Sequence, residues 1–262
     1  MEYGGLTITL RGNSCLIGGQ ANPDGRITAY DVRTSSGVLL SVTGLNVRLE
    51  DYVEASDDAL GTLFARDDSM TGSALADMIS GLTGDDTISG QDGADTLRGG
   101  NGDDSLLGRS GEDVIAGDDN RATIRGGEGN DALYGGWQDD FIVGDRGDDW
   151  LRGGQNNDTM NGGAGEDTLF GDEGNYVLAG SAGADCFVFA NGFGVDRIVD
   201  FEVARADEKI DLRAVRAISD FADLTNEHLF QVGANAEIRD GGNAIVLSGV
   251  DVNALDQDDF IF

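Results

Sequence analysis

Proline, cysteine and histidine are scarce in this sequence, whose 262 residues include one proline, two cysteines and one histidine. Cys15 and Cys186 can form one disulfide at most. Secreted domains held by disulfides use many more, so two unpaired buried thiols are the favoured state. A single proline argues against collagen, and so does the absence of glycine at every third position. His228 and two distant cysteines offer no competing ligand set for a softer metal.

Long apolar runs and positive charge are also missing. No stretch approaches the roughly 20 apolar residues of a membrane span, and residues 1–6 lack the basic and apolar regions of a cleavable signal peptide. The 17 basic residues face 49 acidic ones, and a formal charge of −32 argues against nucleic acid as a partner. The glycine-rich segments never continue into Gly-Lys-Ser/Thr, which excludes a phosphate-binding loop.

Glycine and aspartate, by contrast, recur with a period of nine over residues 72–188. Three of the thirteen uninterrupted units are Gly90-Gln-Asp-Gly-Ala-Asp-Thr-Leu-Arg98, Gly99-Gly-Asn-Gly-Asp-Asp-Ser-Leu-Leu107 and Gly162-Gly-Ala-Gly-Glu-Asp-Thr-Leu-Phe170. Position 1 is Gly in all thirteen units, position 6 is Asp in eleven, and position 8 is a large apolar residue in all thirteen. Such a fixed period indicates one small unit stacked many times.

Each unit predicts a turn followed by a very short strand. Positions 1–6 are rich in Gly, Asp and Asn, which tolerate positive φ and build tight turns. Positions 7–9 place an apolar residue between mostly polar or small neighbours, so that position 8 from Ile79 to Phe187 forms one thin core. The sequence therefore predicts an all-β fold. It is a parallel β-roll of two sheets with eighteen residues per coil, a rod roughly 31 Å long at about 4.8 Å per strand.

The loops between these strands predict calcium sites. Carboxylate and carbonyl oxygens in a flexible loop suit a hard cation with six or more ligands, which is Ca²⁺. The repeats hold 24 acidic and 6 basic residues, and a net charge of −18 would make a compact rod repel itself without cations. Alternatively, these aspartates only end turns and keep the surface soluble, but their strict register favours calcium. Each ion is expected between one loop and the loop eighteen residues later.

The two edges of the predicted roll differ. We name the loops of the odd-numbered units the first edge and those of the even-numbered units the second edge. Position 6 is Asp throughout the first edge, whereas Ala122 and Tyr176 interrupt the second. This predicts about eight well-formed sites, with no filled site flanked by Ala122, because only loops with adjacent aspartates can share an ion. The predicted carboxylate ligands are Asp77, Asp86, Asp95, Asp104, Asp113, Asp131, Asp140, Asp149, Asp158, Asp167 and Asp185, and the site residues include the position-4 glycines Gly84, Gly93, Gly102, Gly111, Gly129, Gly147, Gly165 and Gly183.

These nonapeptides resemble the RTX repeats of secreted bacterial proteins. The segments Ala184-Asp-Cys-Phe-Val-Phe189 and Asp196-Arg-Ile-Val-Asp-Phe201 resemble those that follow the repeats in the serralysin-type C-terminal domain. That resemblance implies a last calcium site with carboxylates from Asp200 and Asp207. The segment Asp258-Asp-Phe-Ile-Phe262 is similar to the terminus associated with type I export. Serralysins also carry a zinc protease domain, but a single histidine cannot supply its His-Glu-x-x-His motif.

The remaining sequence predicts two small caps around the roll. Residues 1–71 read as an N-terminal β-rich cap, with strands near 6–10, 26–30 and 37–42 and a capped helix at 56–65. Residues 72–188 are the roll itself. Residues 189–262 read as a serralysin-like C-terminal cap with the type I secretion signal, with strands near 197–201 and 244–247, a helix near 220–224, and His228 on its surface. An extracellular protein exported without a cleaved N-terminal signal, folding where calcium is abundant, fits this arrangement.

A row of aromatic and arginine residues on the outer face of the predicted roll suits a polysaccharide partner. Tyr134, Trp150, Arg152 and Phe170 lie in adjoining outward columns, and such a row could bind an extracellular polysaccharide by stacking and through guanidinium groups. Docking of a terminal domain over the row is the alternative. Some loops carry two neighbouring acidic residues, which could resemble a catalytic carboxylate pair. Because one member of each pair is a predicted calcium ligand, a catalytic pair is not expected. The sequence thus favours a non-enzymatic calcium-binding matrix or surface component, with an accessory polysaccharide-binding module as the alternative and a membrane-active protein disfavoured.

Overall fold

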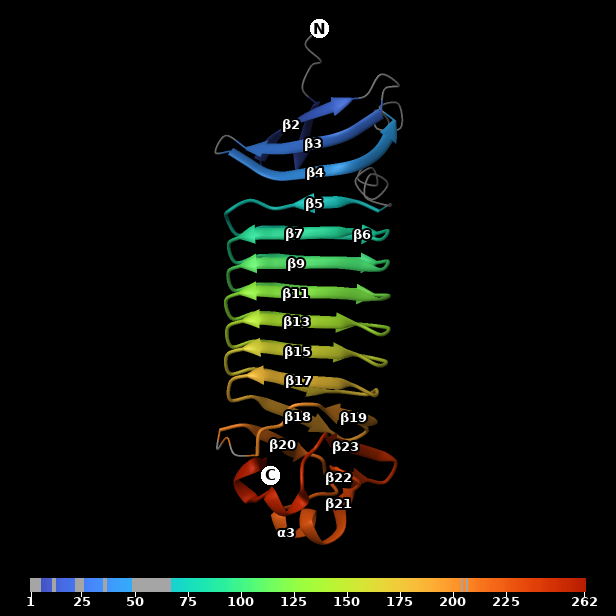
Figure 1. The fold of residues 1–262 in the computed structure, drawn as a ribbon. Helices are drawn as coiled ribbons and strands as arrows, with labels where there is room; N and C mark the ends of the chain where they lie inside the picture. The colour runs from blue at the N-terminus through green and yellow to red at the C-terminus, as the bar shows by residue number, and fades with distance from the viewer. Residues whose placement is uncertain are drawn as a thin grey trace.

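The computed structural model of the chain is a tall stack of coils, with strands β1–β4 at one end and the C-terminal residues at the other (Figure 1). It describes residues 67–203, 205 and 207–262 in full. Before them it describes the backbone of β1 (Leu6–Leu10), β2 (Asn13–Ala21), β3 (Arg26–Thr34) and β4 (Gly37–Arg48). The helix expected at residues 56–65 lies outside the described residues.

Two sheets run along the stack and confirm the predicted parallel β-roll of about seven turns with about 18 residues per turn. Pairing along a sheet advances by one coil each time, as when Ile88 pairs with Leu106 and Leu106 with Ile124. One sheet holds β5 (Ser69–Thr71), β7 (Thr87–Asp92), β9 (Asp104–Ser110), β11 (Ala122–Glu128), β13 (Phe141–Arg146), β15 (Thr159–Ala164), β17 (Val177–Ala182) and β19 (Val195–Ile198). The other holds β6 (Met78–Thr83), β8 (Thr96–Asn101), β10 (Val114–Asp119), β12 (Ala132–Gly136), β14 (Trp150–Gly154), β16 (Thr168–Gly171), β18 (Cys186–Ala190), β20 (Lys209–Ala214) and β24 (Phe260–Ile261).

The strands are longer than the three residues predicted. Strand β7 continues from position 7 of one unit through Gly90 into positions 2 and 3 of the next, and its pairing continues from Gln91 to Arg109 and from Asp92 to Ser110. The prediction of a turn over positions 1–6 was therefore wrong for the first three positions. Because successive loops stack in register, the parallel ladder extends past the core residue, and the turn is confined to positions 4–6.

The core is the predicted single column of position-8 side chains. All thirteen are buried, with Ile79 the most exposed at 5% and Ile88, Leu97 and Ile115 at 0%. Burying a side chain of this size stabilises the fold by about 1.5–3 kcal/mol relative to leaving it exposed. Each strand contributes one such side chain to the core, so the loops at the edges are left to be held by polar contacts.

Both ends of the roll are extended by other strands. At the N-terminal end, β1, β3 and β4 lie where strands were predicted, β2 is an additional strand, and the four pair antiparallel in chain order. Strand β4 pairs with β5 through Ser41 and Thr71. At the C-terminal end, β19 pairs in parallel with β23 (Asn243–Leu247), and β22 (Asn235–Asp240) and β21 (Leu229–Val232) follow antiparallel. The strand expected at 197–201 is observed as Val195–Ile198.

Helical structure among the described residues is short and lies in the C-terminal region. The helix predicted near 220–224 is present as α3 (Phe221–Asp223), which continues into the π-helix η1 (Leu224–His228). Two single turns, η2 (Val252–Ala254) and η3 (Gln257–Asp259), complete it. No helix in the described part of the chain is long and apolar enough to span a membrane.

Candidate metal centre

The position-6 aspartates form one column along each edge of the roll. In both columns the Oδ1 atom accepts a hydrogen bond from the backbone N–H of the residue eighteen positions earlier, at 2.8 Å from Asp77 to Asp95 and 2.8 Å from Asp86 to Asp104. The same contact recurs at 2.7–3.0 Å in the following coils. One oxygen of each carboxylate is therefore used to tie a coil to the one before it.

The second oxygen of these carboxylates is buried and has no hydrogen-bond partner. An ionised oxygen removed from water without a partner is strongly unfavourable, and natural proteins pair such groups or coordinate them to a metal. The Oδ2 atoms in this state are those of Asp68, Asp86, Asp95, Asp104, Asp113, Asp131, Asp140, Asp149, Asp158, Asp167 and Asp196. They form two rows of buried carboxylate oxygens without partners, which a bound cation would satisfy.

The invariant glycine at position 1 leaves room beside each of these oxygens. A Cβ atom on Gly81 would lie 2.0 Å from Asp86 Oδ2 and 2.6 Å from the carbonyl oxygen of Gly99 in the next coil. On the first edge, a Cβ on Gly108 would lie 2.3 Å from Asp113 Oδ2. The carboxylate oxygen and a carbonyl oxygen of the next coil thus face one small space that any larger residue would fill.

Position 4 adds a further carbonyl oxygen. A Cβ on Gly102 would lie 2.1 Å from the carbonyl oxygen of Gly84, eighteen residues earlier, so the position-4 carbonyl is directed at the next loop. Its left-handed backbone is what glycine favours. The residues with this positive φ include Gly84, Gly93, Gly102, Gly111, Gly129, Gly147, Gly165 and Gly183. The donor set between two loops is entirely oxygen, which fits Ca²⁺.

Electrostatics also favours a cation between the loops. Burial, together with the charge of neighbouring carboxylates such as Asp148 beside Asp149, raises the pKa of Asp131, Asp149 and Asp167 to about 7. A raised pKa means that the ionised form of these carboxyl groups is disfavoured in the buried loops. A bound divalent cation would reverse this by stabilising the ionised carboxylates.

Position 5 forms a second ladder in the opposite direction. Asp148 Oδ1 accepts from the backbone N–H of Glu166 at 2.8 Å, and Asp85 Oδ1 accepts from that of Asp103 at 2.8 Å. Position 6 therefore bonds to the preceding coil and position 5 to the following one. Because the position-5 carboxylates are exposed and already bonded, position 6 is left as the anionic group directed into the loop.

The opening of the first edge differs from the rest. Asp77 is half-buried, and its Oδ2 accepts from both the backbone N–H and the hydroxyl of Ser73, at 2.5 and 3.0 Å. Position 4 of this unit is Leu75, the one exception to glycine on this edge. Of the predicted carboxylates, Asp77 is thus the one already satisfied by its own loop.

On the second edge, position 6 is occupied by a side chain without a carboxylate at the two predicted places, Ala122 and Tyr176. A Cβ on Gly117 would meet the Cβ of Ala122 at 2.5 Å instead of a carboxylate. Near the end of that edge, the Phe189 ring would lie 2.4 Å from a Cβ on Gly171, and Tyr176 occupies position 6 with 1% of its surface exposed. At Ala122 no carboxylate oxygen faces the loop. At Tyr176 the repeat aspartate is missing, but Asp196 Oδ2 would lie 3.0 Å from a Cβ on Gly171.

Three acidic residues at the metal columns were missed by the sequence reading. Asp68 lies eighteen residues before Asp86, so extending the register by one unit would have found it; its N–H donates to Asp86 Oδ1 at 2.8 Å. Asp196 accepts from the N–H of Tyr176 at 2.8 Å, but a two-residue insertion hides it from the period. Glu208 is 3% exposed and precedes Lys209, which pairs beside Cys186; no repeat signal marks it.

Of the two carboxylates predicted for the last site, one lies at the loop and the other does not. Asp200 accepts from the N–H groups of Gly180 and Ser181, at 3.2 and 2.9 Å, at the loop that carries Asp185. Asp207 is exposed, whereas the next residue, Glu208, is buried, and its pKa is raised to about 7 by burial and by nearby carboxylates including Asp185 and Asp200. The structure therefore brings Asp200 and Glu208 to the end of the first edge and leaves Asp207 at the surface.

The predicted aromatic row lies along strands β12, β14 and β16. The ring centroids of Tyr134 and Trp150 are 5.2 Å apart, and those of Trp150 and Phe170 are 4.6 Å apart. Tyr134 remains 36% exposed, so the described residues leave the row open. Arg152 forms an ion pair with Asp172, and a groove of about 500 Å³ beside it is lined by Arg152, Gln155 and Trp137, among others.

One family model matches the repeats that carry this geometry. The family model of the RTX calcium-binding nonapeptide repeat matches residues 71–106, 90–121, 117–151, 143–178 and 165–195. No curated protein matches the chain. Among solved structures, the chain is similar to the extracellular lipase LipA from Serratia marcescens, at 20% identity and a TM-score of 0.35, over 73% of this chain and 39% of that chain. This chain therefore carries RTX calcium-binding nonapeptide repeats over residues 71–195.

Proposed function

We propose that this chain is a secreted calcium-binding β-roll protein that folds on calcium after export and acts outside the cell as a non-enzymatic matrix or surface component. The observation that carries the proposal is the double row of buried carboxylate oxygens without partners. Calcium binds only where stacked loops bring these oxygens together, so binding stabilises the folded state by mass action. Extracellular calcium is abundant enough to drive this, whereas cytosolic calcium is not.

The ligands would be the position-6 carboxylates, with backbone carbonyls of the same loops, among them those of the position-4 glycines. The first edge provides six adjacent pairs of aspartates from Asp77 to Asp185. The second provides Asp86 with Asp104 and Asp140 with Asp158, and Asp68 adds one further pair with Asp86. The eight sites expected from the repeats alone thus become about nine, and Asp200 and Glu208 would complete the last loop of the first edge.

Export in an unfolded state is consistent with the position of the C-terminal segment. Phe260 is 6% exposed and pairs with Ile210 of β20, and Asp259 is buried. If residues 258–262 are read by type I secretion machinery, they must be read before β24 joins the sheet. A chain that stays loosely structured until it meets calcium would keep that segment accessible.

The test is a calcium titration of the metal-free chain followed by far-UV circular dichroism, with bound calcium counted by elemental analysis. Strand signal should appear cooperatively at roughly 0.1–1 mM Ca²⁺, the range of extracellular calcium modules. Equal concentrations of Mg²⁺ serve as the control and should produce little strand, because Mg²⁺ demands near-ideal octahedral geometry and keeps its waters. A chain that is fully folded at neutral pH without calcium would overturn the proposal.

A second candidate function is polysaccharide binding in the groove that adjoins the aromatic row at Arg152. Trp137 is 54% exposed at the rim of the groove that Arg152 and Gln155 line, and an exposed indole beside hydrogen-bonding groups suits a sugar ring. The Arg152 guanidinium is already paired with Asp172, so stacking on uncharged rings would contribute more than attraction of acidic groups. Glycan-array binding by the calcium-loaded protein should vanish in Trp137→Ala and persist in Phe141→Ala, which removes an exposed aromatic from the opposite sheet.

A further inference from the structure

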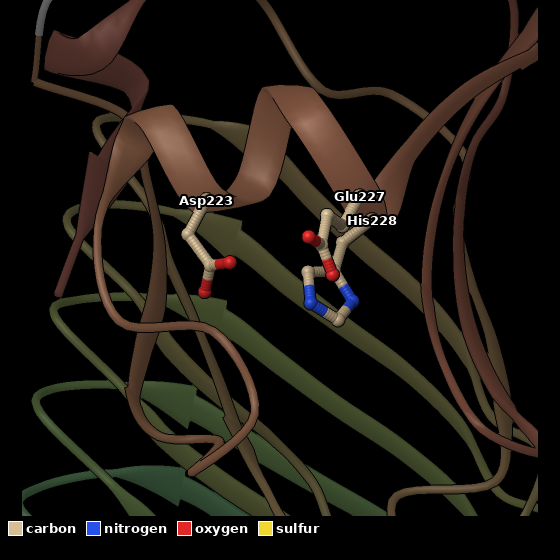
Figure 2. A group of neighbouring side chains, drawn as sticks. All are labelled: Asp223, Glu227 and His228. Carbon is tan, nitrogen blue, oxygen red and sulfur yellow. The ribbon is translucent and has the colours of Figure 1, made fainter.

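We propose that Asp223, Glu227 and His228 form a binding site for a divalent transition-metal ion of the zinc class, separate from the repeat loops. Each residue offers one ligand atom, and these atoms all lie within 4.8 Å of one another. Figure 2 shows the three side chains extending from the same side of one helical segment. Nitrogen from imidazole beside two carboxylates is a donor set unlike the all-oxygen loops.

The π-helix explains why these three residues meet. It spans Leu224–His228 and is closed by a hydrogen bond from the N–H of Leu229 to the carbonyl of Leu224, five residues earlier. A π-helix turn closes after five residues. Glu227 and His228, four and five positions after Asp223, therefore project from the helix close to the direction in which the Asp223 side chain projects. In an α-helix of 3.6 residues per turn the fifth residue would point away. Short π segments are rare and recur at functional sites.

His228 is held in the tautomer that can bind a metal. Its Nδ1 atom lies 2.7 Å from the carbonyl oxygen of Arg239. A carbonyl only accepts, so Nδ1 carries the hydrogen and Nε2 keeps its lone pair. Metal-binding histidines generally donate their other N–H to a carbonyl or carboxylate in this way. The Arg239 guanidinium does not oppose a cation, because it pairs with Glu237 at 2.5 Å.

Asp223 and Glu227 each have a carboxylate oxygen that is available to a metal ion. Asp223 Oδ2 accepts from the N–H and hydroxyl of Ser219, at 2.9 and 3.3 Å, which orients the side chain and leaves Oδ1 available. Glu227 is exposed and has no hydrogen-bond or ion-pair partner within the part of the chain that the structure describes. A tetrahedral ion with bonds of about 2.0–2.1 Å needs donor atoms about 3.4 Å apart, which rotation of the unconstrained Glu227 can supply.

The expected ion is Zn²⁺ or a close relative, with water in the remaining position. Imidazole favours zinc, copper and nickel, whereas calcium and magnesium prefer oxygen. Three protein ligands on one exposed turn form an open site, as zinc sites with a water ligand do. Calcium that saturates the loops should therefore leave this site available to zinc.

The test is a zinc titration of the full, untagged, calcium-saturated chain, followed by calorimetry and by the imidazole NMR signals of His228, the single histidine. One Zn²⁺ per chain should bind and shift these signals. His228→Gln should abolish binding, and Glu227→Gln should weaken it at least tenfold without changing the calcium-bound dichroism spectrum. Asp258→Asn, which removes an exposed carboxylate outside the cluster, should leave zinc affinity unchanged. Unshifted imidazole signals at stoichiometric zinc, or equal weakening by Glu227→Gln and Asp258→Asn, would overturn the proposal.

Discussion

The hydroxyl of Tyr176 donates a hydrogen bond to the carbonyl oxygen of Gly154, which lies one coil earlier on the second edge. Tyr176 occupies the place that aspartate takes in eleven of the thirteen units. Its phenol proton therefore satisfies a carbonyl oxygen at a unit that has no position-6 aspartate of its own. This contact closes the interval between the loops of residues 153–158 and 171–176 without adding negative charge.

Removing that hydroxyl should destabilise the protein to the same extent at all calcium concentrations. Tyr176→Phe leaves the Gly154 carbonyl without its donor, at a cost of about 0.5–1.5 kcal/mol in the free energy of unfolding. Since no ion is expected in this interval, the loss should carry no mass-action contribution from calcium. Urea unfolding at 1 and 10 mM Ca²⁺, as chosen test concentrations, measures it. A loss that grows with calcium would show that the hydroxyl takes part in cation binding.

Asp149→Asn should weaken calcium binding but stabilise the calcium-free fold. The amide can still accept from the N–H of Asp131, now 2.8 Å from Asp149 Oδ1, but it replaces the unpartnered Oδ2 by a group that cannot bind a cation. The calcium midpoint should rise by roughly tenfold or more, on the scale of removing one ligand from a metal site. The calcium-free form should become more stable, because a buried charge is removed.

Asp148→Asn is the matched control for that variant. It changes the net charge equally in the same loop, and its Oδ1 can keep the 2.8 Å contact with Glu166. Because Asp148 is exposed, both the calcium midpoint and the calcium-free stability should change little. Equal shifts of the calcium midpoint in the two variants would mean that net charge, and not the Oδ2 ligand, governs binding.

The calcium-free protein should be more stable in weak acid than at neutral pH. Burial raises the pKa of Asp131, Asp149 and Asp167 to about 7 in the folded state, against about 3.9 when unfolded. A group whose pKa is raised by folding contributes stability that is fully present below its unfolded pKa and is lost as pH rises through the folded pKa. Among the described residues, the pKa of Asp211 is lowered by Arg213 and that of Asp251 by hydrogen bonds from Asn253, and these two groups work the other way.

This pH dependence is measured by urea unfolding of metal-depleted protein at pH 5 and pH 8. The urea midpoint should be higher at pH 5. With calcium present the order should reverse, because protons compete with calcium for the same carboxylates. A calcium-free midpoint that is higher at pH 8 would contradict the assignment of these carboxylates as buried and unpaired.

Gly81→Ala should disrupt the roll although alanine is a small residue. Its methyl group would lie 2.0 Å from Asp86 Oδ2 and 2.6 Å from the Gly99 carbonyl, so the loops must separate. Overpacking of this kind costs about 1–3 kcal/mol, and calcium affinity should fall with it. Gly242→Ala, which meets nothing within 4 Å, is the control and should leave thermal unfolding nearly unchanged. Near-neutral behaviour of Gly81→Ala would show that position 1 is not constrained by the metal space.

Much of the fold followed from the period alone. Gly at position 1, Asp at position 6 and an apolar residue at position 8 are enough to predict the coil length, the core from Ile79 to Phe187 and the calcium loops, and the coils are confirmed. The extent of the strands was not predictable, because hydrogen bonds past Gly90 depend on how well neighbouring loops stack. Asp196 was missed for a related reason, since a two-residue insertion moves it out of the nine-residue count.

By itself, the sequence determined which residues repeat, and therefore the roll, its oxygen-rich edges and the break at Ala122. A period of nine leaves one way to bury every position-8 side chain, which is to stack the units. Only the tertiary structure decided which carboxylate oxygens are without partners and that Glu208, not Asp207, is buried beside Asp185. It also decided that a π-turn brings His228 beside Asp223. These relations depend on the packing of coils and on irregular backbone, for which no repeat provides a signal.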